Sequence, residues 1–113
     1  MKKHLPRYSI FPLLDPGEPL RKRVPVTDEQ GRGLHDFMVL VPGLRDKPQA
    51  LIQEKMTEIY AALSLFGDSV VFAELNLKLN LLWVSVKPRL HIAAEIAGAV
   101  QEILPNARLV THV

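Results

Sequence analysis

The chain has 113 residues, of which 48% are hydrophobic and 23% charged; these proportions are typical of one globular domain with a buried core. It contains no cysteine, which excludes disulfides, thiolate metal sites and a cysteine nucleophile. A formal net charge of +2 is too small to predict binding to nucleic acid or to an anionic membrane.

Residues 1–33 are predicted to form a proline-rich arm, which holds five of the nine prolines. Because proline lacks a backbone N–H, this region is expected to be extended or turned rather than helical. It also carries an apolar cluster between Tyr8 and Leu14 that includes Phe11. The polar stretch 29–33 marks the predicted boundary, so that residues 34–113 form the folded domain.

The first half of this domain is predicted to be a strand followed by a helix. Residues 37–41 are apolar throughout, as in a strand that is buried on both faces. Pro42-Gly43 ends the strand, and a capping box from Asp46 to Gln49 is expected to start the helix. Gly67 is the expected C-cap. One apolar stripe follows the helix at steps of three and four, formed by Ile52, Met56, Ile59, Leu63 and Phe66.

The second half is predicted to be a hairpin, a helix and a last strand. Residues 71–80 alternate between apolar and polar, a turn near Asn80 follows, and 82–86 form the returning strand. A helix over 92–103 and a short strand over 108–111 complete the domain. The inward set on the first hairpin strand is Val71, Ala73, Leu75, Leu77 and Leu79, and the outward set is Glu74, Asn76, Lys78 and Asn80.

This order of elements predicts an α+β fold, a ferredoxin-like βαββαβ sandwich behind the N-terminal arm. Right-handed crossovers give a four-stranded antiparallel sheet in the order 4-1-3-2. Both helices are expected on one face of this sheet, where their apolar stripes meet it.

Residues 38–110 resemble a heavy-metal-associated domain, the ferredoxin-like module of copper and zinc chaperones. Val41-Pro42-Gly43-Leu44 is similar to the family's V-x-G-M, and Leu75-Asn76-Leu77 is similar to its V-N-L. The interval from Asn76 to Pro88 and the spacing of Ile92, Ile96 and Val100 also match the family's second half.

The resemblance implies a metal loop after Gly43, where the family binds soft metals through CxxC. This chain has Asp46 and Gln49 near the two cysteine positions, with Arg45 and Lys47 beside them. A soft cation requires thiolate or thioether ligands, which these residues do not supply. No metal-binding residue carries over from the family, and no cofactor is expected.

The same loop gives an alternative interpretation as a small-ligand site. It loosely resembles the ligand loop of amino-acid-binding regulatory (ACT) domains, and a glycine before a helix N-terminus attracts anions. A plain strand–helix turn remains the other interpretation. The candidate ligand-binding residues are Gly43, Arg45, Asp46 and Lys47.

A second alternative is a metal site formed by His35 and His112. The first and last strands are predicted neighbours, so the start of one lies near the end of the other, and imidazole is the commonest zinc ligand. Ordinary surface histidines would have the same sequence pattern.

No catalytic motif is present, since the chain lacks G-x-S-x-G, a P-loop, G-x-G-x-x-G and H-E-x-x-H. An RNA-recognition domain shares this element order, but no RNP1-like sequence occurs. No run reaches the ~18 apolar residues of a membrane span, and Pro6 and Pro12 interrupt any signal peptide. We therefore expect a cytoplasmic protein that is not an enzyme and binds neither nucleic acid nor membrane.

The sheet face opposite the helices gives the leading functional hypothesis. Leu81, Trp83, Ser85 and Lys87 are expected outward, with either Met38 and Leu40 or Phe37, Val39 and Val41 beside them. Such an apolar patch needs cover, either from the arm through Tyr8 and Phe11, from a second copy as a homodimer, or from a partner protein. The expected function is a non-catalytic protein-binding or adaptor module with the interface residues Trp83, Leu81, Tyr8 and Phe11.

Overall fold

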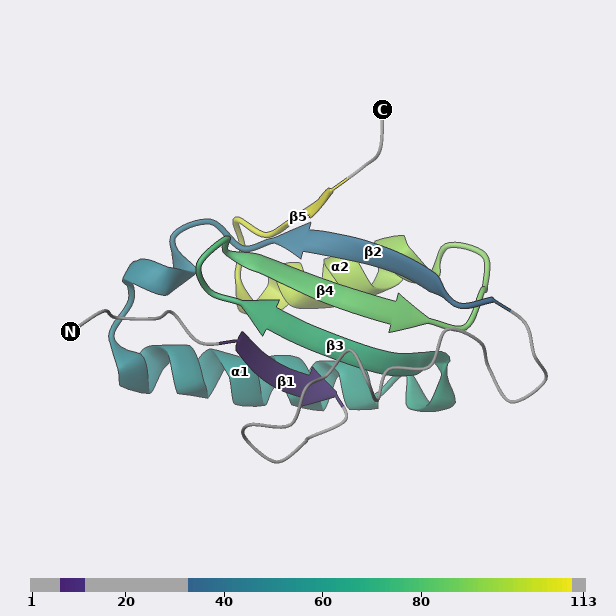
Figure 1. Ribbon diagram of the computed structural model, residues 1–113, viewed down its shortest axis with the longest axis horizontal. Helices are drawn as coiled ribbons and strands as arrows, with labels where there is room; N and C mark the ends of the chain where they lie inside the picture. The colour runs from purple at the N-terminus through teal and green to yellow at the C-terminus, as the bar shows by residue number, and fades with distance from the viewer. Residues whose placement is uncertain (1–6, 12–32, 111–113) are drawn as a thin grey trace.

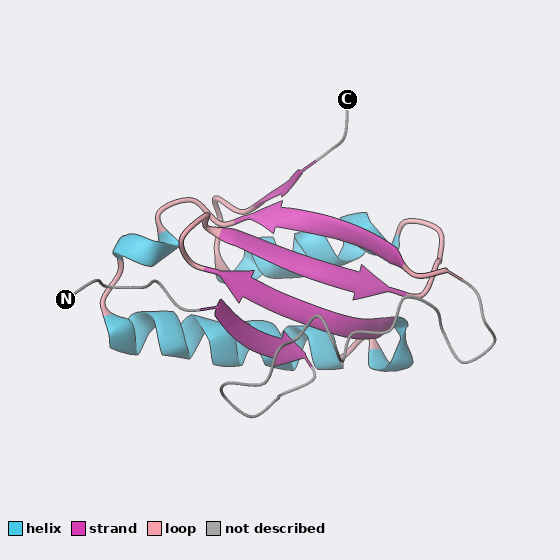
Figure 2. Cartoon of the chain, in the orientation of Figure 1, coloured by secondary structure: helices cyan, strands magenta, loops and turns pink. Residues whose placement is uncertain are grey.

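The structure is a computed structural model that describes residues 7–11 and 33–110 of the chain. In this part of the chain one antiparallel sheet has the strand order β1-β3-β4-β2-β5 (Figure 1). Two α-helices lie on the same face of that sheet, behind it in the view of Figure 2. The elements are β1 Arg7–Phe11, β2 His35–Leu40, η2 Leu44–Asp46, α1 Gln49–Ser64, η3 Gly67–Ser69, β3 Val70–Asn76, β4 Leu81–Val86, α2 Ile92–Ile103 and β5 Arg108–Val110.

The predicted α+β class and strand order are confirmed. Strands β3-β4-β2-β5 are the predicted order 4-1-3-2 read from the opposite edge. All their pairings are antiparallel, and β2 lies between β4 and β5. The local hairpin β3–β4 and the two helical crossovers are therefore where the apolar pattern placed them.

A fifth strand, β1, comes from the predicted arm. It pairs antiparallel with β3, with Arg7 opposite Asn76 and Tyr8 opposite Leu75. The segment is free of proline between Pro6 and Pro12, so every residue in it keeps the N–H that a ladder needs. β1, which precedes the predicted boundary at residue 33, is therefore an edge strand of the sheet.

The core lies between the sheet and the two helices. Each helix presents its predicted apolar stripe to the sheet. Met56, Phe66 and Ile103 are partly buried and pack at the margin of the core. Burial of aliphatic side chains at about 25 cal/mol per Å² is the main stabilising contribution to such a layer. The most buried contributors are Val39, Ile59, Leu63, Ala73, Leu75, Leu82, Val84, Val86, Ile96 and Val100.

The predicted capping box at the start of α1 is wrong. Asp46 lies in η2, and α1 begins at Gln49 with Pro48 as its N-cap and no side-chain capping bond. The cause is Pro48, whose ring disfavours the helical conformation in the preceding residue. Lys47 is accordingly extended, with φ −84° and ψ 158°. At the other end the C-cap is Leu65, and Gly67 instead opens η3.

The predicted alternation in β3 breaks at a bulge. Val70 lies opposite Val86 and Phe72 opposite Ser85, so Val71 is the extra residue. As a result Val70, rather than Val71, joins the core. Leu79 was expected inward, but it is exposed in the turn beyond the end of β3.

Candidate functional site

The face of the sheet opposite the helices, called here the outer face, holds two of the four predicted interface residues, Leu81 and Trp83. Side chains alternate along each strand, so the core positions of β2 and β4 fix which residues face outward. Phe37, Val39 and Val41 are buried in the core, which selects Met38 and Leu40 as the outward pair. The outward residues of β2, β4 and β5 are Asp36, Met38, Leu40, Leu81, Trp83, Ser85, Arg108 and Val110.

An apolar patch occupies the centre of the outer face. Met38 lies opposite Trp83 on one side and opposite Val110 on the other. Met38 is 41% exposed and Val110 39% exposed, while Trp83 is half-buried. Large apolar side chains that remain exposed on adjacent strands indicate an interaction surface. We call this the outer-face patch; its members are Met38, Leu40, Leu81, Trp83 and Val110.

The part of the outer face over β3 is buried. Phe72 is 1% exposed and stacks edge-on against Trp83, with ring centroids 5.2 Å apart at an angle of 79°. Glu74 was expected to be exposed, but only 6% of it is accessible. The reason is β1, because its pairing makes β3 an interior strand and places Ser9 opposite Glu74. The apolar surface is therefore concentrated over β4, β2 and β5.

A hydrogen bond between Ser85 and Asp36 joins β4 to β2 at one end of the outer face. The Ser85 hydroxyl donates to Oδ1 of Asp36 at 2.7 Å, across the β2–β4 ladder. Ser85 is buried, whereas Asp36 is exposed. The bond orients the Asp36 carboxylate on the outer face, and no hydrogen bond from the described residues occupies its second oxygen.

The predicted interface residues Tyr8 and Phe11 do not lie across the outer-face patch. They belong to β1, where they pair with Leu75 and Ala73 of β3 at the edge of the sheet. The order β1-β3-β4-β2 places two strands between this edge and β2. The rest of the apolar cluster, residues 12–14, lies outside the described residues.

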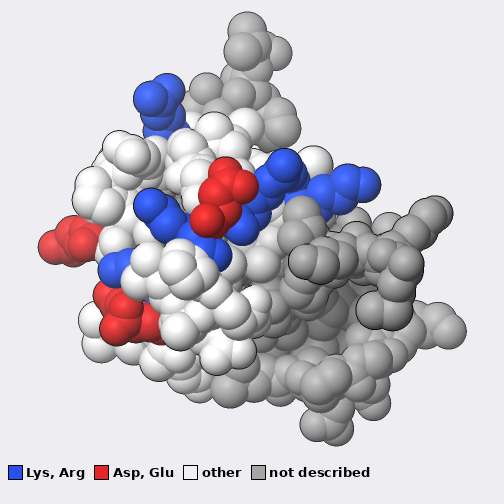
Figure 3. Space-filling view, turned by 90° about the vertical axis from the view of Figure 1, so that its left-hand side faces the viewer, with Lys and Arg blue, Asp and Glu red and all other residues white. Residues whose placement is uncertain are grey.

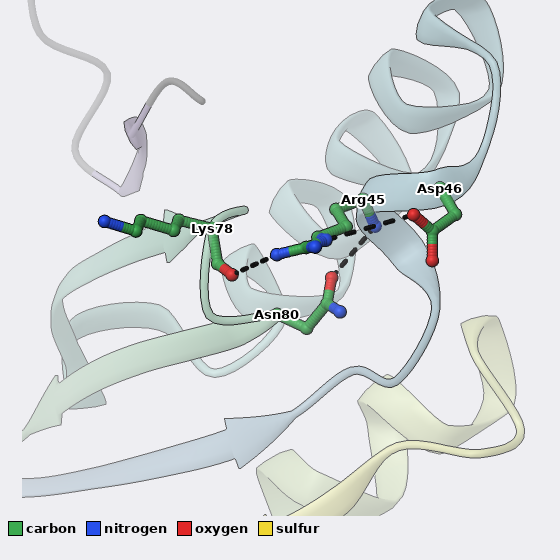
Figure 4. Close-up of polar contacts among 4 residues, drawn as sticks. All are labelled: Arg45, Asp46, Lys78 and Asn80. Carbon is green, nitrogen blue, oxygen red and sulfur yellow. Dashed lines mark hydrogen bonds and ion pairs between the residues drawn. The ribbon is translucent and has the colours of Figure 1, made fainter. Parts of the chain in front are cut away.

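The predicted ligand loop is tied to the β3–β4 turn (Figure 4). The backbone N–H of Arg45 donates to Oδ1 of Asn80 at 2.9 Å, and its guanidinium donates to the Lys78 carbonyl at 2.9 Å. Val41 N–H donates to the Asn80 carbonyl at 2.7 Å. These bonds join two connections that are more than thirty residues apart along the chain.

The loop offers few free donors to an anion. The N–H groups of Asp46 and Lys47 already donate to the carbonyls of Gly43 and Leu44. Asp46 lies 3.9 Å from the Arg45 guanidinium, and both side chains are solvent-exposed, so this pair contributes little. Figure 3 faces this end of the molecule, where basic and acidic side chains are mixed. The geometry therefore favours a structural turn at Gly43, Arg45, Asp46 and Lys47.

The structure places His35 in the same surface groove as His91, a histidine that the sequence analysis does not pair with it. His35 and His91 line an open groove of about 720 Å³, together with Arg89. The remaining lining residues are Leu34, Pro88 and Leu90. The signal was available, because Pro88 ends the strand that runs antiparallel to the one starting at His35. His112 lies outside the described residues.

A metal centre has no further support in residues 7–11 and 33–110. Across these residues no three His, Asp or Glu side chains come together in a group that could hold a metal ion.

Neither of the helices described here has the length and apolar character needed to cross a membrane.

Comparison with known proteins gives no independent assignment. A scan against protein-family models finds no family that matches the chain, and searches of curated proteins and of solved structures find no match.

Proposed function

We propose that this chain is a non-catalytic protein-binding module of ferredoxin-like type, with the outer-face patch as its binding surface. One observation carries the proposal: Met38 and Val110 lie side by side, 41% and 39% exposed, on a face that neither helix covers. Removing such surface from water is favourable by about 25 cal/mol per Å².

The composition of the patch supports binding to a protein. Trp83 is half-buried beside Met38, and tryptophan is enriched among the residues that dominate interface energies. Methionine adapts its shape to different neighbours. The exposed charges Asp36 and Arg108 lie at the margins, which matches the polar rim of an interface.

We also propose that the chain is related to heavy-metal-associated domains but does not bind or transfer soft metals. The strand order β3-β4-β2-β5 and the two helices on one face support this likeness, because a ferredoxin-like module is expected to have the same arrangement. The loop that would carry the two cysteines holds Asp46 and Gln49 instead, and Arg45 is engaged with the β3–β4 turn. A binding role for the open face accounts for the exposed apolar residues, which a metal or small-ligand role at the loop leaves unexplained.

The proposal is tested by placing a charge in the patch. Met38→Glu is compared with Leu65→Glu, because Leu65 is a large exposed residue at the end of α1, in the helical layer. Both variants gain the same charge, and circular dichroism verifies that both are folded. Native mass spectrometry measures self-association, and affinity capture followed by titration with the purified partner measures binding to other proteins.

The expected result is binding that survives Leu65→Glu and is lost in Met38→Glu. Trp83 is the only tryptophan in the chain, so its emission reports directly on occupation of the patch. Binding that Met38→Glu leaves intact, or the absence of both self-association and any purified partner, would overturn the proposal.

A further inference from the structure

We infer that the outer-face patch binds a second copy of this chain in an antiparallel arrangement, with Asp36 of each copy beside Arg108 of the other. The inference rests on the proposed function and names its partner. It comes from the distribution of charge on the outer face, which is complementary to itself under one particular twofold rotation.

The two charges lie at opposite ends of the patch. Along β2 the outward residues are Asp36, Met38 and Leu40, and Arg108 lies opposite Leu40 on β5. At about 3.4 Å per residue, Asp36 and Leu40 are about 14 Å apart. Met38 is therefore midway between an acidic end and a basic end.

Both charges are available for a partner. Within the strands β2, β4 and β5 these are the two charged outward residues, and both are exposed, whereas Lys87 follows β4 at the Asp36 end and is half-buried. Among the described residues, Asp36 accepts one hydrogen bond, from Ser85 at Oδ1, and its other carboxylate oxygen can accept another. No hydrogen bond or ion pair within the described residues engages the Arg108 guanidinium.

A twofold axis decides which groups meet. An axis in the interface plane, perpendicular to the strands and passing at Met38, exchanges the two ends of the patch. It brings Asp36 of one copy over the Leu40–Arg108 end of the other, and this pairing occurs twice because the interface is isologous. The alternative axis, parallel to the strands at Met38, sets Asp36 against Asp36 and brings both copies of Arg108 to the same end of the interface, so no opposite charges meet and like charges disfavour it.

The apolar centre fits the same arrangement. With the axis at Met38, the two methionines meet at the middle, flanked by Trp83 and Val110 of each copy. Two sheets that pack face to face keep their strands within about 30° of alignment, which this rotation permits. The exposed apolar surface of each copy then becomes the core of a sandwich.

The test is charge exchange in the full-length chain, measured by sedimentation over a range of concentrations. Asp36→Arg and Arg108→Asp each replace two attractive pairs with two repulsive ones, so each raises the dissociation constant of the dimer about tenfold or more. The double variant, Asp36→Arg with Arg108→Asp, restores the dimer because it reverses both partners. Asp46→Arg has the same change in net charge away from the face and leaves the dimer unchanged.

The outcomes separate this inference from the proposed function. A wild-type chain that stays monomeric while a purified partner still binds through Met38 overturns the second copy and leaves the binding module standing. A dimer that Met38→Glu breaks but charge exchange does not alter overturns the antiparallel arrangement. A dimer that is indifferent to Met38→Glu overturns both.

Discussion

Trp83 and Phe72 stack edge to face across the β3–β4 ladder, with their ring centroids 5.2 Å apart. Phe72 is buried and Trp83 half-buried, so the pair joins the covered part of the outer face to its exposed part. The tryptophan has two roles in one position: its edge contact stabilises the fold, and its accessible surface belongs to the outer-face patch.

The two roles of Trp83 are separable by substitution. We expect Trp83→Lys to lower the free energy of unfolding by about 1–2 kcal/mol, because it removes the aromatic contact and its buried area, and to abolish binding through the patch. Trp83→Phe keeps an aromatic ring beside Phe72 and costs less. Urea unfolding followed by far-UV circular dichroism measures both, since neither variant retains a tryptophan. Equal stability of the two variants would contradict the role assigned to the stacked pair.

Asn80 is expected to hold the β2–α1 connection against the β3–β4 turn. Its side chain accepts from Arg45 N–H at 2.9 Å, and its backbone is left-handed with φ 52°. Asn80→Ala loses the acceptor and is strained in that conformation, so we expect a loss of about 1–2 kcal/mol in unfolding free energy. Asn80→Asp keeps an acceptor and tolerates the same backbone. If thermal unfolding shows no difference between these two variants, the hydrogen bond does not contribute.

The same substitution is expected to have opposite effects at two glycines. Gly43 has φ 78°, whereas Gly98 lies inside α2, and an added Cβ meets nothing within 4 Å at either position. Gly43→Ala therefore costs about 1 kcal/mol through backbone strain alone. Gly98→Ala stabilises by about 0.5–1 kcal/mol, because alanine loses less entropy in a helix. Chemical denaturation of the two variants measures the sign directly, and the same sign at both would contradict the backbone argument.

Truncation of an inward helical side chain is expected to be costly, and truncation of an outward one is not. Ile59 is fully buried against the sheet and Leu65 is 88% exposed. We expect Ile59→Ala to lower the unfolding free energy by about 2–5 kcal/mol, through lost burial and the cavity left behind. Leu65→Ala changes it by less than about 0.5 kcal/mol. A small effect at Ile59 would mean that α1 packs less closely than described.

The sequence alone predicted the order of strands and helices. It also predicted the apolar stripe on each helix and the face of the sheet on which the helices pack. The spacing of Ile52, Ile59 and Leu63 puts all three on one face of the helix, and that face is buried in the core. The alternation of Ala73 and Leu75 likewise puts both on the buried face of the strand. The periodicity of apolar residues can be read from a short stretch of sequence. The face of the helix or strand that this periodicity makes apolar is the face that packs into the core. Right-handed crossovers then leave few sheet orders to choose from.

Tertiary structure alone decided the rest, because it depends on pairings between distant segments. The strand Arg7–Phe11 adds to β3 by backbone hydrogen bonds, which carry little sequence signal, and its presence explains the burial of Glu74. The bulge at Val71 likewise depends on how β3 meets β4. The register of β2 with β5 decides that Met38 and Arg108, seventy positions apart in the sequence, lie on the same face of the sheet.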